Sequence, residues 1–138
     1  MKQLLSGVIL MLILCGGCTN LEQPWREQKL PSGKAVKVTL FQLVWGAEHD
    51  ERRPNDDCLA LEFVMTNPAA DADAREAEAL DVFELVRPVS EQWGFRTASL
   101  AGFQSTRRKG AYDLYSFRRN ADGSWSHQHS QAKVFIDD

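Results

Sequence analysis

One amphipathic helix pattern, with strand-like segments on both sides, most constrains the fold of this chain of 138 residues. Asn67 and Pro68 are residues favoured at the start of a helix, and Gly94 followed by Phe95 is typical of a helix end. Between them, apolar residues recur at spacings of three and four, which places them on one helix face. They are Ala79, Val82, Phe83, Val86, Val89 and Trp93. The pattern predicts a helix between residues 67 and 94 that buries one face.

Strand-like segments precede and follow this helix. In the segment 58–66, Leu59, Leu61, Phe63 and Met65 alternate with other residues and therefore share one face of a strand. Similar short segments are found at 35–45, 97–104, 112–119 and 125–136, and the last of these is expected to be either one strand or two strands that divide near residue 130. The order β-β-α-β-β-β predicts an α+β fold, with one amphipathic helix packed on a mainly antiparallel sheet.

The segment before the first of these strands lacks any hydrophobic period. Pro24, Pro31 and Gly33 interrupt residues 18–34, which predicts a flexible tether. Residues 35–138 then form a single small domain, long enough to bury a core without a metal or a disulfide. The chain has 16 Lys and Arg against 19 Asp and Glu. Such a weakly acidic balance argues against a nucleic-acid partner.

Residues 1–17 have the features of an export signal. Lys2 is followed by an apolar run from Leu4 to Leu14, and Gly16 and Gly17 come after it. A run of roughly ten apolar residues is too short to cross a bilayer, which needs about 20. A positive start, a short apolar region and small residues at its end are typical of a signal peptide.

Two cysteines, Cys15 and Cys18, enclose the two glycines at the end of this segment. A redox Cys-x-x-Cys site normally opens a helix within a βαβ pattern, whereas a polar stretch follows Cys18 here. Leu14-Cys15-Gly16-Gly17-Cys18 instead resembles the lipobox of bacterial lipoproteins. The resemblance implies cleavage before Cys18 and lipidation of its thiol. Cys15 departs from the family, which usually has an aliphatic residue at that position.

The resemblance covers about the first twenty residues and concerns location alone. Thr19 follows Cys18, and the family implies attachment to the outer membrane on its periplasmic side when that residue is not Asp. Two acyl chains suffice for stable anchoring, so the membrane itself is an expected partner. An ordinary cleaved signal that releases a free periplasmic protein is the alternative.

Cys58 would be the single unmodified cysteine of such a processed chain. It opens the apolar run Cys58-Leu59-Ala60-Leu61, which favours a buried and inert thiol. A lone thiol in an oxidising compartment is unusual. A disulfide between two molecules, or a reactive or ligating role, therefore remains an alternative.

His127 and His129 are the sharpest candidates for chemistry. Residues two apart on a strand face the same side, so both imidazoles could reach one metal ion, with His49, Asp50 or Glu51 as further ligands. The residues around the pair are polar, however, which a solvated hairpin explains. We therefore predict no metal site and no cofactor.

A basic turn and a tryptophan are the candidates for a partner surface. Arg107, Arg108 and Lys109 are adjacent, and Trp125 follows a turn among polar residues. An exposed Trp is a frequent anchor in protein interfaces. The alternatives are a solvated turn for the basic residues and packing on the neighbouring strand for Trp125.

Motifs of enzymes are missing from the sequence. It contains no Gly-x-Ser-x-Gly turn, no Ser-x-x-Lys and no Gly-rich phosphate loop. We predict a non-catalytic lipoprotein that binds another component of the cell envelope, such as an envelope protein. The alternatives are a metal-binding or enzymatic domain that uses His127 and His129, an immunity or inhibitor lipoprotein, and a purely structural lipoprotein.

Overall fold

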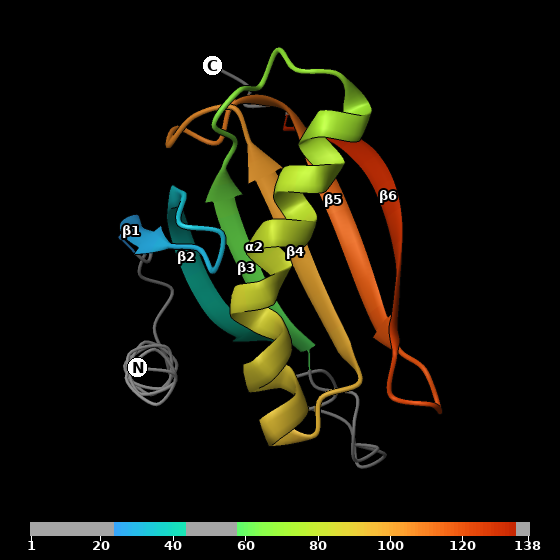
Figure 1. Cartoon of the computed structure of the whole chain (residues 1–138). Helices are drawn as coiled ribbons and strands as arrows, with labels where there is room; N and C mark the ends of the chain where they lie inside the picture. Colours follow the sequence, from blue (N-terminus) through green and yellow to red (C-terminus); the bar gives the residue numbers. More distant parts are fainter. Residues whose placement is uncertain (1–23, 44–57, 135–138) are drawn as a thin grey trace.

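The structure is a computed structural model that describes residues 24–43 and 58–134. Within these residues, the strands form one sheet in which their order across the sheet is their order along the chain. The elements are β1 (Arg26–Lys29), β2 (Ala35–Leu43), β3 (Cys58–Val64), α2 (Ala72–Trp93), β4 (Thr97–Phe103), β5 (Gly110–Arg119) and β6 (Trp125–Val134). Helix α2 lies on one face of the sheet (Figure 1). The predicted α+β fold, with one helix on a mainly antiparallel sheet, is confirmed.

One pair of neighbouring strands is parallel. Strands β3 and β4 run in the same direction, with Leu61 opposite Leu100, and all other neighbours are antiparallel. Parallel strands need a long crossover between them, and α2 is that crossover. Strand β6 continues through Ser130, which lies opposite Leu114, so the break suggested near residue 130 is not present.

Part of the predicted tether belongs to the sheet. Strand β1 pairs with β2 in antiparallel register, Arg26 opposite Val38. The predicted breakers Pro31 and Gly33 form the turn between these strands, where Gly33 has φ +94° and donates its N–H to Leu30 O at 2.8 Å. A polar strand of four residues, Arg-Glu-Gln-Lys, has no apolar alternation to reveal it. The flexible tether of 18–34 is therefore wrong for residues 26–29.

Helix α2 begins later than its sequence suggested and ends where expected. Asp71 caps the N-terminus, its carboxylate accepting from Ala74 N at 2.8 Å. Asn67, the predicted start, instead closes a turn through Ala70 N. At the C-terminus Gly94 adopts φ +74°, and the Phe95 N–H donates to Ser90 O at 2.8 Å. The left-handed glycine followed by a buried apolar residue is the predicted C-terminal cap.

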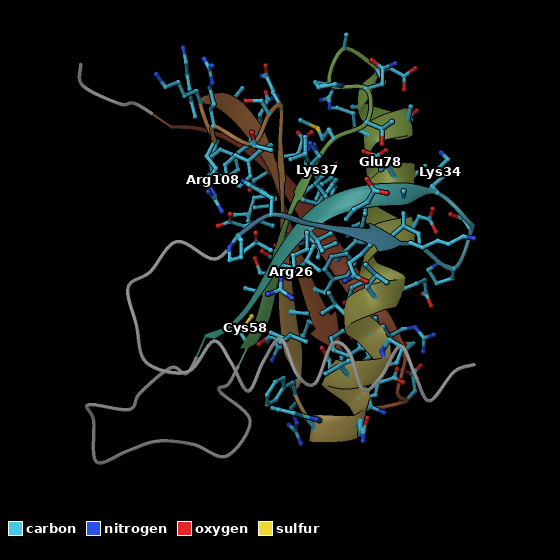
Figure 2. All side chains as sticks on the ribbon, turned by 90° about the vertical axis from the view of Figure 1, so that its left-hand side faces the viewer. Arg26, Lys34, Lys37, Cys58, Glu78 and Arg108 are labelled. Atoms are coloured by element: carbon cyan, nitrogen blue, oxygen red, sulfur yellow. The ribbon has the colours of Figure 1, made fainter. Side chains whose placement is uncertain are left out.

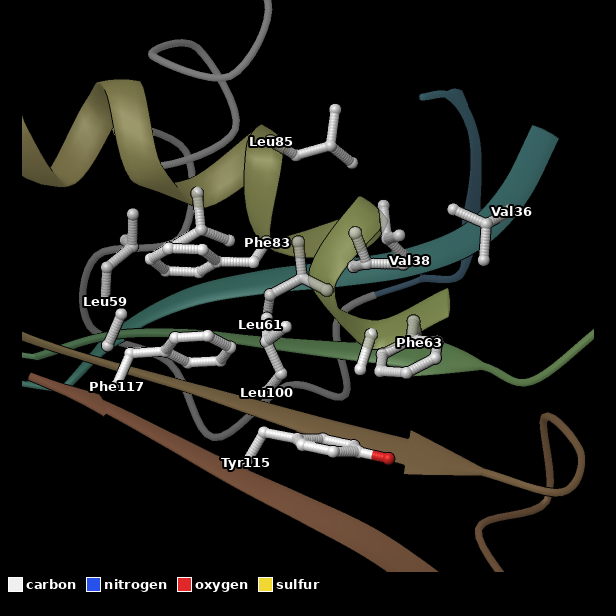
Figure 3. Close-up of a cluster of buried hydrophobic side chains, with 14 of the residues drawn as sticks. Val36, Val38, Leu59, Leu61, Phe63, Phe83, Leu85, Leu100, Tyr115 and Phe117 are labelled. Carbon is white, nitrogen blue, oxygen red and sulfur yellow. The ribbon is translucent and has the colours of Figure 1, made fainter. Parts of the chain in front are cut away.

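The hydrophobic core lies between α2 and the sheet (Figure 3). Val82 and Val86 of the helix are fully buried, as are Leu59 of β3 and Leu100 of β4. The predicted inward face of β3 is confirmed, because all four of its alternating residues belong to this core. Each such side chain contributes about 1.5–3 kcal/mol through its burial. The core holds α2 over the middle of the sheet.

Cys58 lies at the start of β3 and is buried, with 7% of its surface exposed. Burial raises the pKa of the Cys58 thiol, and a hydrogen bond with Thr97 partly opposes that effect. A raised pKa keeps the thiol protonated and therefore poorly nucleophilic. These two properties agree with the predicted buried thiol.

Candidate functional site

A single helix cannot cover a sheet of this width. A helix with its side chains is about 10–12 Å across, and neighbouring strands are about 4.8 Å apart. Helix α2 lies mainly over β3 and β4. Of the helix-facing side chains farther across the sheet, Tyr115 and Phe117 of β5 are still buried in the core, whereas His127 and His129 of β6 lie at its margin. We call this region the α2–β6 seam. It comprises Arg75, Glu76, Leu80, Phe83, Glu84, Arg87, Glu91, Asp113, Tyr115, Phe117, Trp125, His127 and His129.

A buried carboxylate, Asp113, joins three elements at one end of the seam. Only 1% of its surface is exposed. Its Oδ2 accepts from Arg75 Nε of α2 at 2.7 Å, and its Oδ1 lies 2.8 Å from His129 Nε2 of β6. Arg75 also donates through Nη1 to the carbonyl of Ala70, before the helix. A buried charge needs such partners, and these fix the N-terminal part of α2 to β5 and β6.

A second carboxylate–imidazole pair lies next to the first. His127 Nε2 is 2.5 Å from Glu76 Oε1 of α2. The rings of the two histidines pack on aromatic residues directly opposite them on β5: His129 stacks on Tyr115 with centroids 4.7 Å apart, and His127 lies 5.5 Å from Phe117. Both imidazoles are therefore oriented by a carboxylate and by a ring.

Tyr115 places a hydroxyl in the interior without a partner. Its side chain is fully buried, and its Oη makes no hydrogen bond to any residue that the structure describes. Burial, with the nearby charge of Asp113 adding to it, raises the pKa of Tyr115 to about 12. The hydroxyl is therefore protonated at neutral pH. A buried hydroxyl without a partner costs about 1–3 kcal/mol.

The other half of the seam is a groove of about 390 Å³ between α2 and the β5–β6 hairpin. Its floor is aromatic: Phe83 stacks on Phe117 with centroids 3.8 Å apart, and Trp125 meets Phe83 edge-on at 5.4 Å. Leu80 lines the groove and is 39% exposed, the one exposed large apolar side chain in the described part of the chain. The groove is an apolar surface that is open to solvent.

Charged side chains of α2 form one wall of this groove. Arg87 pairs with Glu84 at 2.7 Å and with Glu91 at 3.3 Å, and Glu91 also accepts from the indole Nε1 of Trp125 at 3.0 Å. Glu84 remains 41% exposed and Arg87 37%. The wall thus contains two carboxylates for one guanidinium, and the turn residues Gly123 and Ser124 form the opposite wall.

The residues predicted as one partner surface lie apart from each other. Trp125 is half-buried and packs on the core, with its N–H bound to Glu91, which agrees with the alternative that this side chain packs rather than projects. Arg107, Arg108 and Lys109 lie in the turn between β4 and β5, and Figure 2 shows Arg108 on the side of the sheet opposite α2. Trp125 belongs to the groove, and the basic turn does not.

Arg108 has a structural role in that turn. Its Nε lies 2.5 Å from Glu62 Oε2, and its guanidinium stacks over the ring of Trp25 at 4.4 Å. Trp25 in turn donates its indole N–H to the carbonyl of Thr106 at 3.0 Å. Arg107 and Lys109 are exposed. Of the three basic residues, Arg107 and Lys109 are thus the ones presented to solvent.

The histidine pair lies on the helix side of the β5–β6 hairpin, where His127 is half-buried and His129 is exposed. Its contacts are with Glu76 and Asp113, and no group of three or more metal-ligating side chains occurs within residues 24–43 and 58–134. The further ligands considered from sequence, His49, Asp50 and Glu51, lie outside the described residues, as does Cys18. In the described part of the chain, no helix is long and apolar enough to cross a membrane.

Sequence reasoning did not single out the residues that organise the seam. Asp113 alternates with Tyr115 and Phe117, so the strand period places a carboxylate at a position that faces the core. A carboxylate at a core-facing position of a strand indicates a buried ion pair, because a buried charge needs a partner. Arg75 and Glu76 gave no comparable signal, because charged residues are ordinary in the first turns of a helix.

Comparisons with protein-family models, with curated proteins and with solved structures found no match for this chain.

Proposed function

We propose that this chain is a lipoprotein of the outer membrane, anchored through Cys18 and facing the periplasm, whose domain is a non-catalytic binding module for another envelope protein. The observation that supports recognition is the groove of the α2–β6 seam. It combines an exposed Leu80, a half-buried Trp125 and a charged wall. Apolar anchors surrounded by charged groups are the usual composition of a protein-binding surface.

Within the described residues, neither histidine is hydrogen-bonded to a hydroxyl or thiol nucleophile. Nucleophilic catalysis requires a nucleophile within hydrogen-bond reach of a base. The Nε2 atoms of His127 and His129 are directed at carboxylates instead, one on α2 and one on β5. The thiol of Cys58 is buried at the start of β3 and has a raised pKa, which suppresses its reactivity.

The anchor and the domain have separable roles in this proposal. Lipidation of Cys18 confines the domain to the membrane surface, and the folded domain recognises the partner. Replacing Cys18 by Ala behind a cleavable secretion signal should release the protein into the soluble periplasmic fraction. A Cys18→Ala protein that stays in the membrane fraction would show that something other than the lipid attaches it.

The test of the proposed function is co-purification after crosslinking in cells, with the native and the soluble Cys18→Ala forms side by side. We expect the same envelope protein with both forms, and more of it with the anchored one. Absence of any specific adduct with either form would overturn the binding proposal. A metal that co-purifies and is lost from a His127→Ala/His129→Ala variant would favour the metal-binding alternative.

A further inference from the structure

The apolar side chains and the charges of the groove in the α2–β6 seam determine which kind of peptide segment can bind there. Its floor offers the exposed Leu80 and the half-buried Trp125 as apolar contacts, next to the buried ring of Phe83. A partner side chain that covers them is removed from water, and full burial of one aliphatic or aromatic side chain is worth about 1.5–3 kcal/mol. The occupant therefore needs at least one large apolar side chain.

The charge of α2 determines which charge the bound segment should have. The segment 71–93 has seven acidic residues against two basic ones, Arg75 and Arg87, which gives a net charge of −5. The acidic residues are Asp71, Asp73, Glu76, Glu78, Asp81, Glu84 and Glu91. Complementary charge steers partners to a surface and rejects like-charged ones. Of these acidic residues only Glu84 and Glu91 line the groove, where both pair with Arg87, so one carboxylate is in excess there. This excess, together with the wider charge of the helix, would repel an anionic lipid surface and attract a basic peptide segment.

We infer that the groove binds a segment of a protein partner that is rich in lysine or arginine, with one apolar side chain of that segment seated against Leu80 and Trp125. The inference rests on the proposed function and names the class of partner. The cations of the segment would face Glu84 and Glu91. Arg87 pairs with both carboxylates but its single positive charge balances only one of their two negative charges. A second copy of this chain is the rival occupant, because its segment 94–134 has seven basic residues against two acidic ones.

The test uses the full lipidated chain in nanodiscs of uncharged phosphatidylcholine, with a fluorescent nonapeptide that has one central Leu flanked by Lys residues. Fluorescence anisotropy measures its affinity for the native chain and for two variants. Leu80→Lys adds a cation inside the groove. Ala74→Lys adds the same charge to an exposed position of the same helix that does not line the groove.

We expect Leu80→Lys to weaken binding of the peptide about tenfold or more, because about 1.5 kcal/mol of apolar contact corresponds to that factor. Ala74→Lys should change the affinity by less than about threefold, since it alters only the long-range field. A peptide with Ala in place of its Leu should lose the difference between the two variants. Leu80 is exposed, so the thermal unfolding midpoint of its variant should match that of the native chain.

Four results would overturn the inference. Equal weakening by Leu80→Lys and Ala74→Lys would mean diffuse attraction by charge rather than binding in the groove. No binding of the peptide to the native chain would remove the basic segment as occupant. Self-association that Leu80→Lys abolishes would identify a second copy in the groove. A partner that crosslinks in cells and is unaffected by Leu80→Lys would leave the proposed function standing while this inference fails.

Discussion

Helix α2 meets the sheet through two chemically different contacts. Over β3 and β4 the contact is apolar, with Val82, Val86 and Leu100 fully buried. Along β5 and β6 the stacking of Phe83 on Phe117 is joined by ion pairs, a Trp–Glu hydrogen bond and a groove. The apolar contact supplies free energy in proportion to buried area. The seam, at the margin of the helix, instead fixes charged groups in place and keeps part of the apolar surface accessible. Both contacts therefore stabilise the fold, and the seam contains the exposed large apolar side chain of the described residues, Leu80.

Asp113→Ala should have the largest effect on stability. It removes the buried carboxylate that is hydrogen-bonded to Arg75 and His129, which are themselves partly exposed, and a hydrogen bond to a charged group contributes about 1.5–3 kcal/mol. Urea denaturation of the native chain and the variant measures the difference. Asp122→Ala, which removes an exposed carboxylate from the β5–β6 turn, is the control. A loss no larger than that of the control would mean that the ion pairs do not hold the seam together.

Gly102→Ala tests how tightly the apolar contact is packed. A Cβ at this position of β4 would lie 2.8 Å from Cζ of Phe63 and 3.3 Å from Cγ of Met65. Overpacking of a core typically costs about 1–3 kcal/mol. The same denaturation experiment measures this loss. A stability equal to that of the native chain would show that the core under α2 can accommodate a methyl group at this position. The apolar contact would then not be tightly packed.

Tyr115→Phe should change stability little at pH 7 but remove a pH dependence. The hydroxyl has no partner among the described residues, so its removal should be neutral or stabilising by up to about 1 kcal/mol. Because its folded pKa is about 12 against an ordinary value of 10.0, the native chain should lose stability as pH rises from about 10 to 12. This loss is about 2–3 kcal/mol. Unfolding free energies measured across this pH range should diverge between the two proteins; parallel curves would contradict the buried position of the hydroxyl.

Leu80→Ala should have the smallest effect on stability, below about 0.5 kcal/mol, because surface substitutions outside the core are usually within that range. Leu80 is the exposed apolar residue of the groove. Thermal unfolding, with Leu85→Ala as a buried control on the same helix, measures the difference. A loss comparable to that of Leu85→Ala would mean that Leu80 supports the fold and is not reserved for a ligand.

Much of the fold could be predicted from periodicity. The stripe of α2 and the alternation of β3 follow from side chains that must face one core, and both are found in the structure. Strand β1 could not be predicted, because four polar residues at a sheet edge pair through their backbone and leave no apolar pattern. The start of α2 was displaced because Asn67 and Asp71 are both good capping residues.

The seam could be predicted only in part. His127 and His129 were recognised as a pair on one strand face, but their partners Glu76 and Asp113 come from α2 and β5. Which helix residue reaches which strand depends on how α2 is aligned over the sheet, and one sequence does not specify that alignment. The groove is missed for the same reason, since Leu80 and Trp125 are 45 positions apart in the chain.

The most direct test of a binding role for the seam is photocrosslinking in living cells from single positions of the native chain. A photoreactive residue at Leu80 probes the groove, and one at Arg118, an exposed residue of β5 with a side chain on the helix-free face, is the control. We predict one specific protein adduct from position 80 and none from position 118. An adduct only from position 118, or none from position 80, would contradict the account.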